Sequence, residues 1–396
     1  MPKTARSVER NILLSLPESL RRLSSNSRLN LESSLADSWA ARTPATVPPT
    51  PKFCIIGAGA IGGMIAALLS RAGAMVNVVA RGTTLAALKR HGLRLIINGE
   101  MLQASIGISE DPAELGVQDY EIIAVKTPSL AEVARQLHPL LGAETAGVPA
   151  MNGVPWWFFL NAKGVLAGHQ LDAIDPSGTI GQAISVRRVI GCVVHTAASV
   201  DEPGVIRHSR GRQLFVGEPD NRLTPRLARL TEWLRRAGFD CRQRTNIQSD
   251  IWFKLWGNLS MNPISLLTSA TSDRILDDPL VRRLCVSMME EAARIGAALG
   301  LEGAGSIENM IGRIRDLGSF KMSMLQDVER DRPIELDALL TVTHDIGKLA
   351  GVPTPFIDSV LGLTRLRAAS LGLAQADRQG VDGNGHDRRS TPAHVG

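Results

Sequence analysis

The chain has 396 residues, of which 44% are hydrophobic and 21% charged, and its formal net charge is +5. This balance is typical of a soluble globular protein, and the length favours two domains over one. No apolar run reaches the about 18 residues of a membrane-spanning helix, so we expect no membrane span. Basic and acidic residues are mixed along the chain, which argues against a nucleic-acid partner.

The cysteines are far apart and form neither a CxxC pair nor a Cys/His cluster with zinc spacing. They are Cys54, Cys192, Cys241 and Cys285. We expect buried, reduced thiols in a cytoplasmic protein, with no disulfide framework and no metal site.

Both ends of the chain have the composition of disordered segments. Residues 1–51 are rich in Ser, Arg and Pro and end in a proline-rich linker. Glu9 and Glu18 argue against a transit peptide, so we expect a disordered extension or a start codon placed too far upstream. Residues 376–396 are rich in Gly, Asp, Arg and His and are predicted to be a second disordered tail.

Short strands alternate with helices between residues 52 and 245, which predicts a parallel sheet covered by helices. Asn98-Gly99 indicates a hairpin between two of these strands. The expected strands lie at 53–56, 75–79, 93–97, 102–108, 120–125, 189–195 and 214–216, and the expected helices at 61–72 and 130–141.

Helical periodicity dominates from residue 246 to residue 375. The sequence therefore predicts an N-terminal α/β domain followed by an all-helical domain, with ligands in a cleft between them. The expected helices lie at 247–262, 280–299, 306–315, 335–350 and 356–371.

A glycine motif follows the first predicted strand and opens the first helix. In a Rossmann fold the first glycine permits a tight turn, the second lets the backbone approach a pyrophosphate, and the third permits close helix–strand packing. The alternative is an ordinary glycine-rich turn. We predict that this motif binds a dinucleotide through Gly57, Ala58, Gly59, Ala60, Ile61 and Gly62.

Arg81 stands near the end of the second predicted strand, where NAD sites carry an acidic residue. No acidic residue occurs between Gly57 and Asn98. An arginine at this point accommodates a 2′-phosphate, so the sequence favours NADP (NADPH) over NAD. The alternative is a solvated arginine.

Lys126 and Asn152 each follow an apolar run in the same domain. Ligands of doubly wound sheets lie beyond the carboxyl ends of the strands, so both are candidate site residues. Each of them alone is more often an ordinary loop residue.

Lys254, Asn258 and Asn262 are spaced four residues apart in an otherwise apolar helical segment. This spacing places the cation and the two amides on one helix face. Polar groups on an apolar helix are unfavourable unless they face a ligand or solvent, which makes the three residues a candidate active site. The alternative is a solvated lysine with capping asparagines.

Taken together, these motifs resemble those of the ketopantoate reductase (2-dehydropantoate 2-reductase) family over roughly residues 52 to 370. The resemblance rests on the glycine turn, on Arg81, on the Val-Lys-Thr around Lys126, and on segments 152–157, 252–263, 323–327 and 335–337. It implies a Rossmann domain at 52–245 and a helical domain at 246–375 that is similar to the C-terminal domain of 6-phosphogluconate dehydrogenase.

The resemblance also implies a reaction, the NADPH-dependent reduction of ketopantoate to pantoate, with Lys254 as proton donor. Glu335 matches a catalytic carboxylate that also lies near the nicotinamide. Substrate-binding positions are matched by Asn152, Asn258, Asn262 and Ser323, and cofactor-binding positions by Lys126, Asn152 and Ala198.

Two departures and two alternatives stay open at this point. The N-terminal extension is not a family feature, and segment 156–177, with Trp156, Trp157, Phe158 and Phe159, is longer than compact members need. The oxo acid is therefore open, and a paralogue that reduces another small 2-oxo acid is the first alternative. A non-catalytic NADP-sensing regulator is the second. A homodimer is compatible with the sequence.

Overall fold

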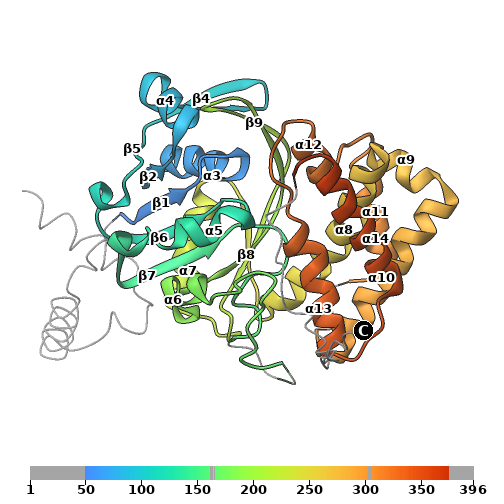
Figure 1. Ribbon diagram of the computed structural model, residues 1–396. Coiled ribbons are helices and arrows are strands. Elements are labelled where there is room, and N and C mark those ends of the chain that lie inside the picture. The colour runs from blue at the N-terminus through green and yellow to red at the C-terminus, as the bar shows by residue number, and fades with distance from the viewer. Residues whose placement is uncertain (1–49, 161–163, 165, 302–304, 374–396) are drawn as a thin grey trace, which may run out of the picture. The chain divides into compact units, whose positions relative to one another are not determined.

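The computed structural model describes residues 50–160, 164, 166–301 and 305–373. Its first half contains a five-stranded parallel sheet with strand order β5-β2-β1-β6-β7 (Figure 1). The strands are β1 Lys52–Ile56, β2 Met75–Val79, β5 Gly107–Ser109, β6 Gln118–Ile123 and β7 Leu141–Pro149. Three helices follow strands β1, β2 and β6, and these are α3 Ala60–Arg71, α4 Gly82–His91 and α5 Thr127–Ala134, respectively. The predicted parallel sheet is confirmed.

A second sheet has strand order β10-β9-β3-β4, with β8 paired to β9. Its strands are β3 Leu93–Ile97, β4 Glu100–Ala104, β8 Gly191–Glu202, β9 Val205–Gly217 and β10 Asp240–Gln243. The hairpin predicted at Asn98-Gly99 is the β3–β4 hairpin, and Asn98 has a φ of 54°. The strand predicted at 102–108 is wrong as one element, because β4 ends at Ala104 and β5 joins the parallel sheet beside β2.

Helix α3 lies between the two sheets. Its buried residues share one hydrophobic core with Ile55 and Val78 of the parallel sheet and with Ile206 and Leu214 of the second sheet. Gly63 makes this packing close, since a Cβ there would lie 2.7 Å from the side chain of Ile206. This tight core holds the glycine turn before α3 in a fixed position.

The second half is helical, as predicted. Its elements are α8 Ile247–Thr268, α9 Ser272–Asp277, α10 Pro279–Ala298, α11 Ile307–Arg315, α12 Ser323–Val328, the π-helix η5 Asp337–Thr341, α13 Val342–Leu349 and α14 Pro355–Ser370. The helix predicted at 335–350 begins instead with the π-helix. Trp252 anchors α8 to α10, because its indole N–H donates to the carbonyl of Ala292 at 2.8 Å.

The remaining described helices are short, apart from one. They are η2 Pro112–Leu115, η3 His138–Leu140, α6 Thr179–Ala183, η4 Val186–Arg188 and the longer α7 Pro225–Arg236.

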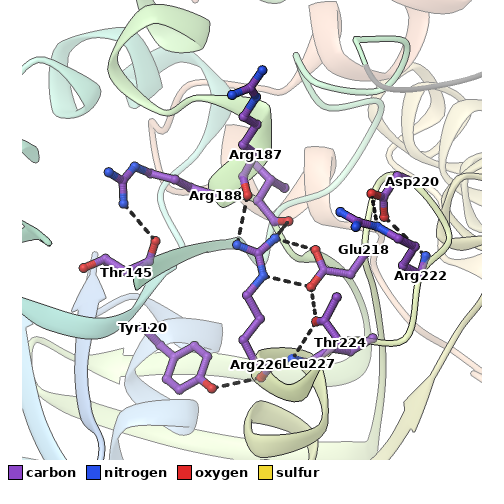
Figure 2. A network of polar contacts seen from close by, with 11 residues as sticks. Tyr120, Thr145, Arg187, Arg188, Glu218, Asp220, Arg222, Thr224, Arg226 and Leu227 are labelled. Atoms are coloured by element: carbon purple, nitrogen blue, oxygen red, sulfur yellow. Dashed lines mark hydrogen bonds and ion pairs between the residues drawn. The ribbon is translucent and has the colours of Figure 1, made fainter. Parts of the chain in front are cut away.

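An ion pair between half-buried Arg226 and buried Glu218 fixes the start of α7 against the end of β9 (Figure 2). Arg226 donates two hydrogen bonds to the carboxylate of Glu218, which is 2% exposed. Its guanidinium also donates to the carbonyl of Arg187 at 2.9 Å, and its own carbonyl accepts from the hydroxyl of Tyr120. A bidentate pair with further bonds to backbone satisfies the buried charge, so we assign this network a structural role.

The described residues from Pro51 onward form one compact unit. The predicted extension lies outside the described residues except for Thr50 and Pro51, and the predicted tail at 376–396 lies outside them altogether. Cys54, Cys192, Cys241 and Cys285 are buried and free, as predicted. Within the part of the chain that the structure describes, no helix is long and apolar enough to cross a membrane.

Candidate active site

The turn between β1 and α3 needs glycine at two positions for steric reasons. Gly57 has a φ of +97°, and a Cβ there would lie 2.8 Å from the side chain of Val125. A Cβ on Gly62 would lie 2.1 Å from the carbonyl oxygen of Gly57. A Cβ on Gly59, by contrast, would meet nothing within 4 Å. Gly59 therefore presents open backbone, which is what a bound pyrophosphate requires.

The N-terminus of α3 is the natural phosphate site beside this turn. Its first turn carries no acidic residue, and its N-cap, Gly59, offers no side chain to the free N–H groups. Ala58 is buried, while Ala60 and Ile61 are half-buried. Free N–H groups and the positive end of the helix dipole suit the phosphates of a dinucleotide. The residues present fit such a cofactor.

Arg81 follows β2 and is exposed. Its guanidinium forms an ion pair with Glu132 of α5 at 2.5 Å and also donates to the side chain of Gln136. Arg81, the residue predicted to bind the 2′-phosphate, therefore lies at the carboxyl edge of the sheet. Its acidic partner, Glu132, was not apparent from the sequence.

Lys254 connects the helical half to the α/β half. Its Nζ donates to the side-chain oxygen of Asn152 at 2.9 Å and to the carbonyl oxygen of Val194, on β8, at 2.8 Å. The structure thus brings together two predicted site residues from the two halves. The carbonyl of Val194 is a partner that sequence reasoning missed, because backbone groups carry no residue-type signal.

Burial lowers the pKa of Lys254 to about 8, because a desolvated ammonium is disfavoured. The negative charge on Glu335 opposes this shift. A lysine with a pKa near the working pH can both hold a proton and release it, as a general acid must.

Glu335 lies on the far side of Asn152 and is 8% exposed. Its carboxylate accepts from the side-chain nitrogen of Asn152 at 3.4 Å and from the backbone N–H of Thr127 at 3.5 Å. Burial raises its pKa, an effect that the charge of Lys126 opposes. The amide of Asn152 therefore bridges Lys254 and Glu335 and fixes their relative position.

The loop that carries Asn152 packs directly against the π-helix η5. Val154 donates its N–H to the carbonyl of Ala338 at 3.0 Å. Gly153 has a φ of +81°, and a Cβ there would lie 2.2 Å from that same carbonyl oxygen. Only glycine permits this approach, and π-helical turns are frequent at functional sites.

Lys126 forms a second connection between the two halves. Its Nζ lies 2.5 Å from a carboxylate oxygen of Asp327 and donates to the carbonyl of Pro333 at 3.0 Å. Burial raises the pKa of Asp327, and hydrogen bonding to Lys126 opposes the rise. Asp327 lies in the motif at 323–327, but no role was assigned to it from the sequence.

Asn262 is 2% exposed, and its side-chain oxygen accepts from the hydroxyl of Ser323 at 2.8 Å. Its side-chain nitrogen donates to the carbonyl of Asn258, one helical turn earlier. The structure therefore brings Asn262 and Ser323 together and joins α8 to α12. The half-buried side chain of Asn258 has no hydrogen-bond partner among the described residues, so its amide is available. Substrate contacts of all three stay predictions.

Ala198 is the predicted residue that lies apart from this cluster. It is on β8, four residues beyond Val194, opposite His208, and packs against the core that contains α3. His195, beside Val194, stacks edge-on against Phe215. Burial and the nearby charge of Lys254 lower its pKa to about 3, so it is neutral and adds no charge to the site.

A small cavity of about 20 Å³ lies next to Asn152. Its walls include Thr127, Trp156 and Trp157, and the hydroxyl of Thr127 and both indole N–H groups have no partner among the described residues. Phe158 and Phe159 are buried, and Phe158 packs against Trp252. Of the aromatic residues in the long segment, the two tryptophans border the site and the two phenylalanines belong to the core.

The chain is similar to known proteins. The family model described as ketopantoate reductase PanE/ApbA matches residues 53–221, and its C-terminal counterpart matches residues 246–368. The 2-dehydropantoate 2-reductase of Mesorhizobium japonicum is 46% identical over 322 residues, which are 81% of this chain and 99% of that protein. The chain belongs to the ketopantoate reductase family.

Solved structures agree with this assignment. A candidate ketopantoate reductase from Ralstonia solanacearum MolK2 has a TM-score of 0.78 and 50% identity, and the match covers 82% of this chain and 99% of that one. A D-mandelate dehydrogenase solved with NADH and anilino(oxo)acetate has a TM-score of 0.69 at 20% identity, with 81% and 99% covered. At that identity the likeness shows the fold alone.

Proposed function

We propose that the protein reduces 2-dehydropantoate (ketopantoate) to pantoate with NADPH, and that Lys254 donates the proton. The observation that carries the proposal is the hydrogen-bonded line Lys254–Asn152–Glu335, which joins the two halves beside a glycine turn suited to a dinucleotide. Membership of the ketopantoate reductase family supports the choice of substrate.

When bound, NADPH supplies a hydride to the carbonyl carbon of the 2-oxo acid. The carbonyl oxygen then gains negative charge, which the ammonium of Lys254 stabilises before giving up its proton to that oxygen. The hydroxyl of the product forms by this transfer, and solvent returns a proton to the amine. A pKa of about 8 leaves Lys254 largely protonated at neutral pH and able to release the proton.

The other assignments follow from position. We propose that Asn258, Asn262 and Ser323 form the substrate side on α8 and α12, with the free amide of Asn258 as the direct ligand. Lys126, Asn152 and Glu335 face the nicotinamide end, and the turn from Gly57 to Gly62 holds the phosphates. Arg81 is assigned to the 2′-phosphate. Ala198, which lies apart from this cluster, is assigned to the cofactor from the family resemblance alone.

We further propose that residues 52–245 bind the cofactor and residues 246–375 bind the substrate. The cytoplasm is the proposed location and a homodimer the proposed assembly. Both rest on the class of enzyme rather than on a contact in the molecule.

A second 2-oxo acid is the main rival, because Trp156 and Trp157 line a cavity beside Asn152. A regulator that only senses NADP is disfavoured, since sensing requires no lysine–asparagine–glutamate line between the two halves.

Oxidation of NADPH and of NADH, followed at 340 nm against a panel of 2-oxo acids, tests the proposal. We expect ketopantoate to have the highest kcat/KM. A higher value for another 2-oxo acid would identify the paralogous reductase, and binding of NADPH without turnover of any acid would favour the sensor.

A further inference from the structure

The ion pair between Arg81 and Glu132 lies across the end of strand β1. In the parallel sheet, β1 stands between β2 and β6. Arg81 follows β2, and Glu132 lies on α5, which follows β6. The pair therefore spans the point where the strand order reverses, which is where open α/β sheets bind their ligands.

Both terminal nitrogens of the Arg81 guanidinium already have hydrogen-bond partners. One terminal nitrogen contacts Glu132 and the other contacts Gln136, one helical turn further along the same segment. A guanidinium binds phosphate best when it offers both nitrogens in a fork, and here both already face acceptors, one from α5 and one from just beyond its end. A 2′-phosphate that reaches Arg81 must share it with a carboxylate.

From this arrangement we infer that Glu132 determines the nucleotide preference of the enzyme, by competing with the 2′-phosphate of NADPH for Arg81. The carboxylate repels a dianionic phosphate, whereas it does not repel the neutral 2′-hydroxyl of NADH. Glu132 therefore weakens NADPH selectively and brings the affinities for the two nucleotides closer together. The inference rests on the proposed placement of the 2′-phosphate at Arg81.

Glu132 is a specificity residue in this scheme and takes no part in the hydride or proton transfer. Its side chain is 61% exposed and that of Arg81 is 44% exposed. An exposed pair of this kind contributes little to folding, so it can be altered without loss of structure. The competition is electrostatic between exposed groups, so salt weakens it.

The test uses the adenosine fragments 2′,5′-ADP and 5′-AMP, which differ at the 2′ position, and measures binding to the full-length protein by calorimetry. We expect Glu132→Gln to tighten 2′,5′-ADP by roughly three- to tenfold at low salt and to leave 5′-AMP within about twofold. The gain shrinks as salt is added. Unchanged or weaker binding of 2′,5′-ADP to Glu132→Gln overturns the inference.

Two further variants separate this result from the proposed function. Asp277→Asn removes the acid of a matched exposed pair, in which Arg315 is 45% and Asp277 65% exposed, and should leave both fragments unaffected. Arg81→Ala should abolish the preference for 2′,5′-ADP. If it does not, Arg81 is not the phosphate ligand, and the proposed cofactor site fails whatever Glu132→Gln does.

Discussion

The ammonium of Lys254 lies 2.9 Å from the side-chain oxygen of Asn152, although 102 residues separate them in the chain. The same amide donates to Glu335, so a single asparagine holds the proposed acid and a carboxylate in register. The positions of both charges therefore depend on one neutral side chain. Substitution of each residue should have its own measurable effect.

Replacing Lys254 removes the proposed proton donor. We expect Lys254→Ala to lower kcat by a factor of roughly 100 to 10,000, the usual contribution of a positioned general acid. The Kd for NADPH should change little, because no phosphate-binding group is altered. Stopped-flow turnover and fluorescence titration of NADPH measure the two effects. Turnover near the normal rate would remove Lys254 from the proton-donor role.

Lys254→Ala also removes a donor from the oxygen atoms of Asn152 and Val194, so folding must be checked. Lys254→Gln is the companion variant, since its amide can donate to one of these oxygens but cannot release a proton at neutral pH. We expect similar loss of kcat in both variants and a smaller loss of thermal stability for Lys254→Gln.

The pH dependence of kcat should report the protonation of Lys254. Because the donor must carry its proton, and its pKa is lowered to about 8, kcat should fall as pH rises through about 8. Asn152→Asp places a carboxylate beside the ammonium and also opposite Glu335, and the added negative charge favours the charged form of Lys254 and raises its pKa. The falling limb should therefore move to higher pH, together with a lower maximal rate.

The pH–rate profile of Asn152→Asp decides this point. If the fall of kcat stays at the same pH or moves to lower pH, a group other than Lys254 controls it. Ser323→Ala, which alters the substrate side without adding charge, should keep the limb where it is and serves as the control.

Two glycines of the same turn should respond differently to alanine. Gly59→Ala adds a methyl group with no neighbour within 4 Å, so the protein should fold normally, yet that methyl group would obstruct a pyrophosphate. Gly62→Ala would place Cβ 2.1 Å from the carbonyl oxygen of Gly57 and should reduce stability. Calorimetric Tm and NADPH titration distinguish the two effects.

Gly312→Ala supplies the control for this pair, because Gly312 lies in α11 and its Cβ would also meet nothing within 4 Å. We expect it to leave NADPH binding unchanged and to raise Tm slightly, because alanine is more favourable than glycine inside a helix. Normal NADPH affinity in Gly59→Ala would contradict the proposed phosphate site.

The glycine turn was predictable from sequence because its requirements are local. A buried strand, a residue with positive φ and a helix start are all contained in about ten residues, and each leaves a residue-type signal. The spacing of Lys254, Asn258 and Asn262 was similarly readable as one helix face, since α8 covers the whole segment.

Contacts between distant segments were not predictable from patterns alone. The pairing of Arg81 with Glu132 depends on the order of strands, and an exposed glutamate on a helix has many possible partners. The strand predicted at 102–108 failed because β4 and β5, though two residues apart, pair with different sheets. The periodicity of apolar residues indicates which positions are buried, but it does not indicate which segment covers them.

Glu121, on β6, gives a prediction about stability that is independent of the active site. It is fully buried, and neither carboxylate oxygen has a hydrogen-bond partner among the described residues. Burial raises its pKa from 4.5 to about 8, an effect that the charge of Arg188 opposes. The folded state therefore holds a proton that the unfolded state releases above pH 4.5.

A group whose folded pKa is raised stabilises the fold below its unfolded pKa and loses that contribution as pH rises through its folded pKa. The free energy of unfolding should thus fall by on the order of a few kcal/mol between about pH 4.5 and 8 through Glu121. Glu121→Gln cannot ionise, so urea titrations at several pH values should show a flatter dependence and higher stability at pH 8.

Glu291 is the matched control, because it is also fully buried but accepts hydrogen bonds from the N–H groups of Phe356 and Ile357. Its charge is satisfied at the start of α14, where a helix dipole favours it. Glu291→Gln should therefore lower stability at pH 8, opposite in sign to Glu121→Gln. Equal effects of the two substitutions would show that Glu121 has a partner and carries its charge at neutral pH.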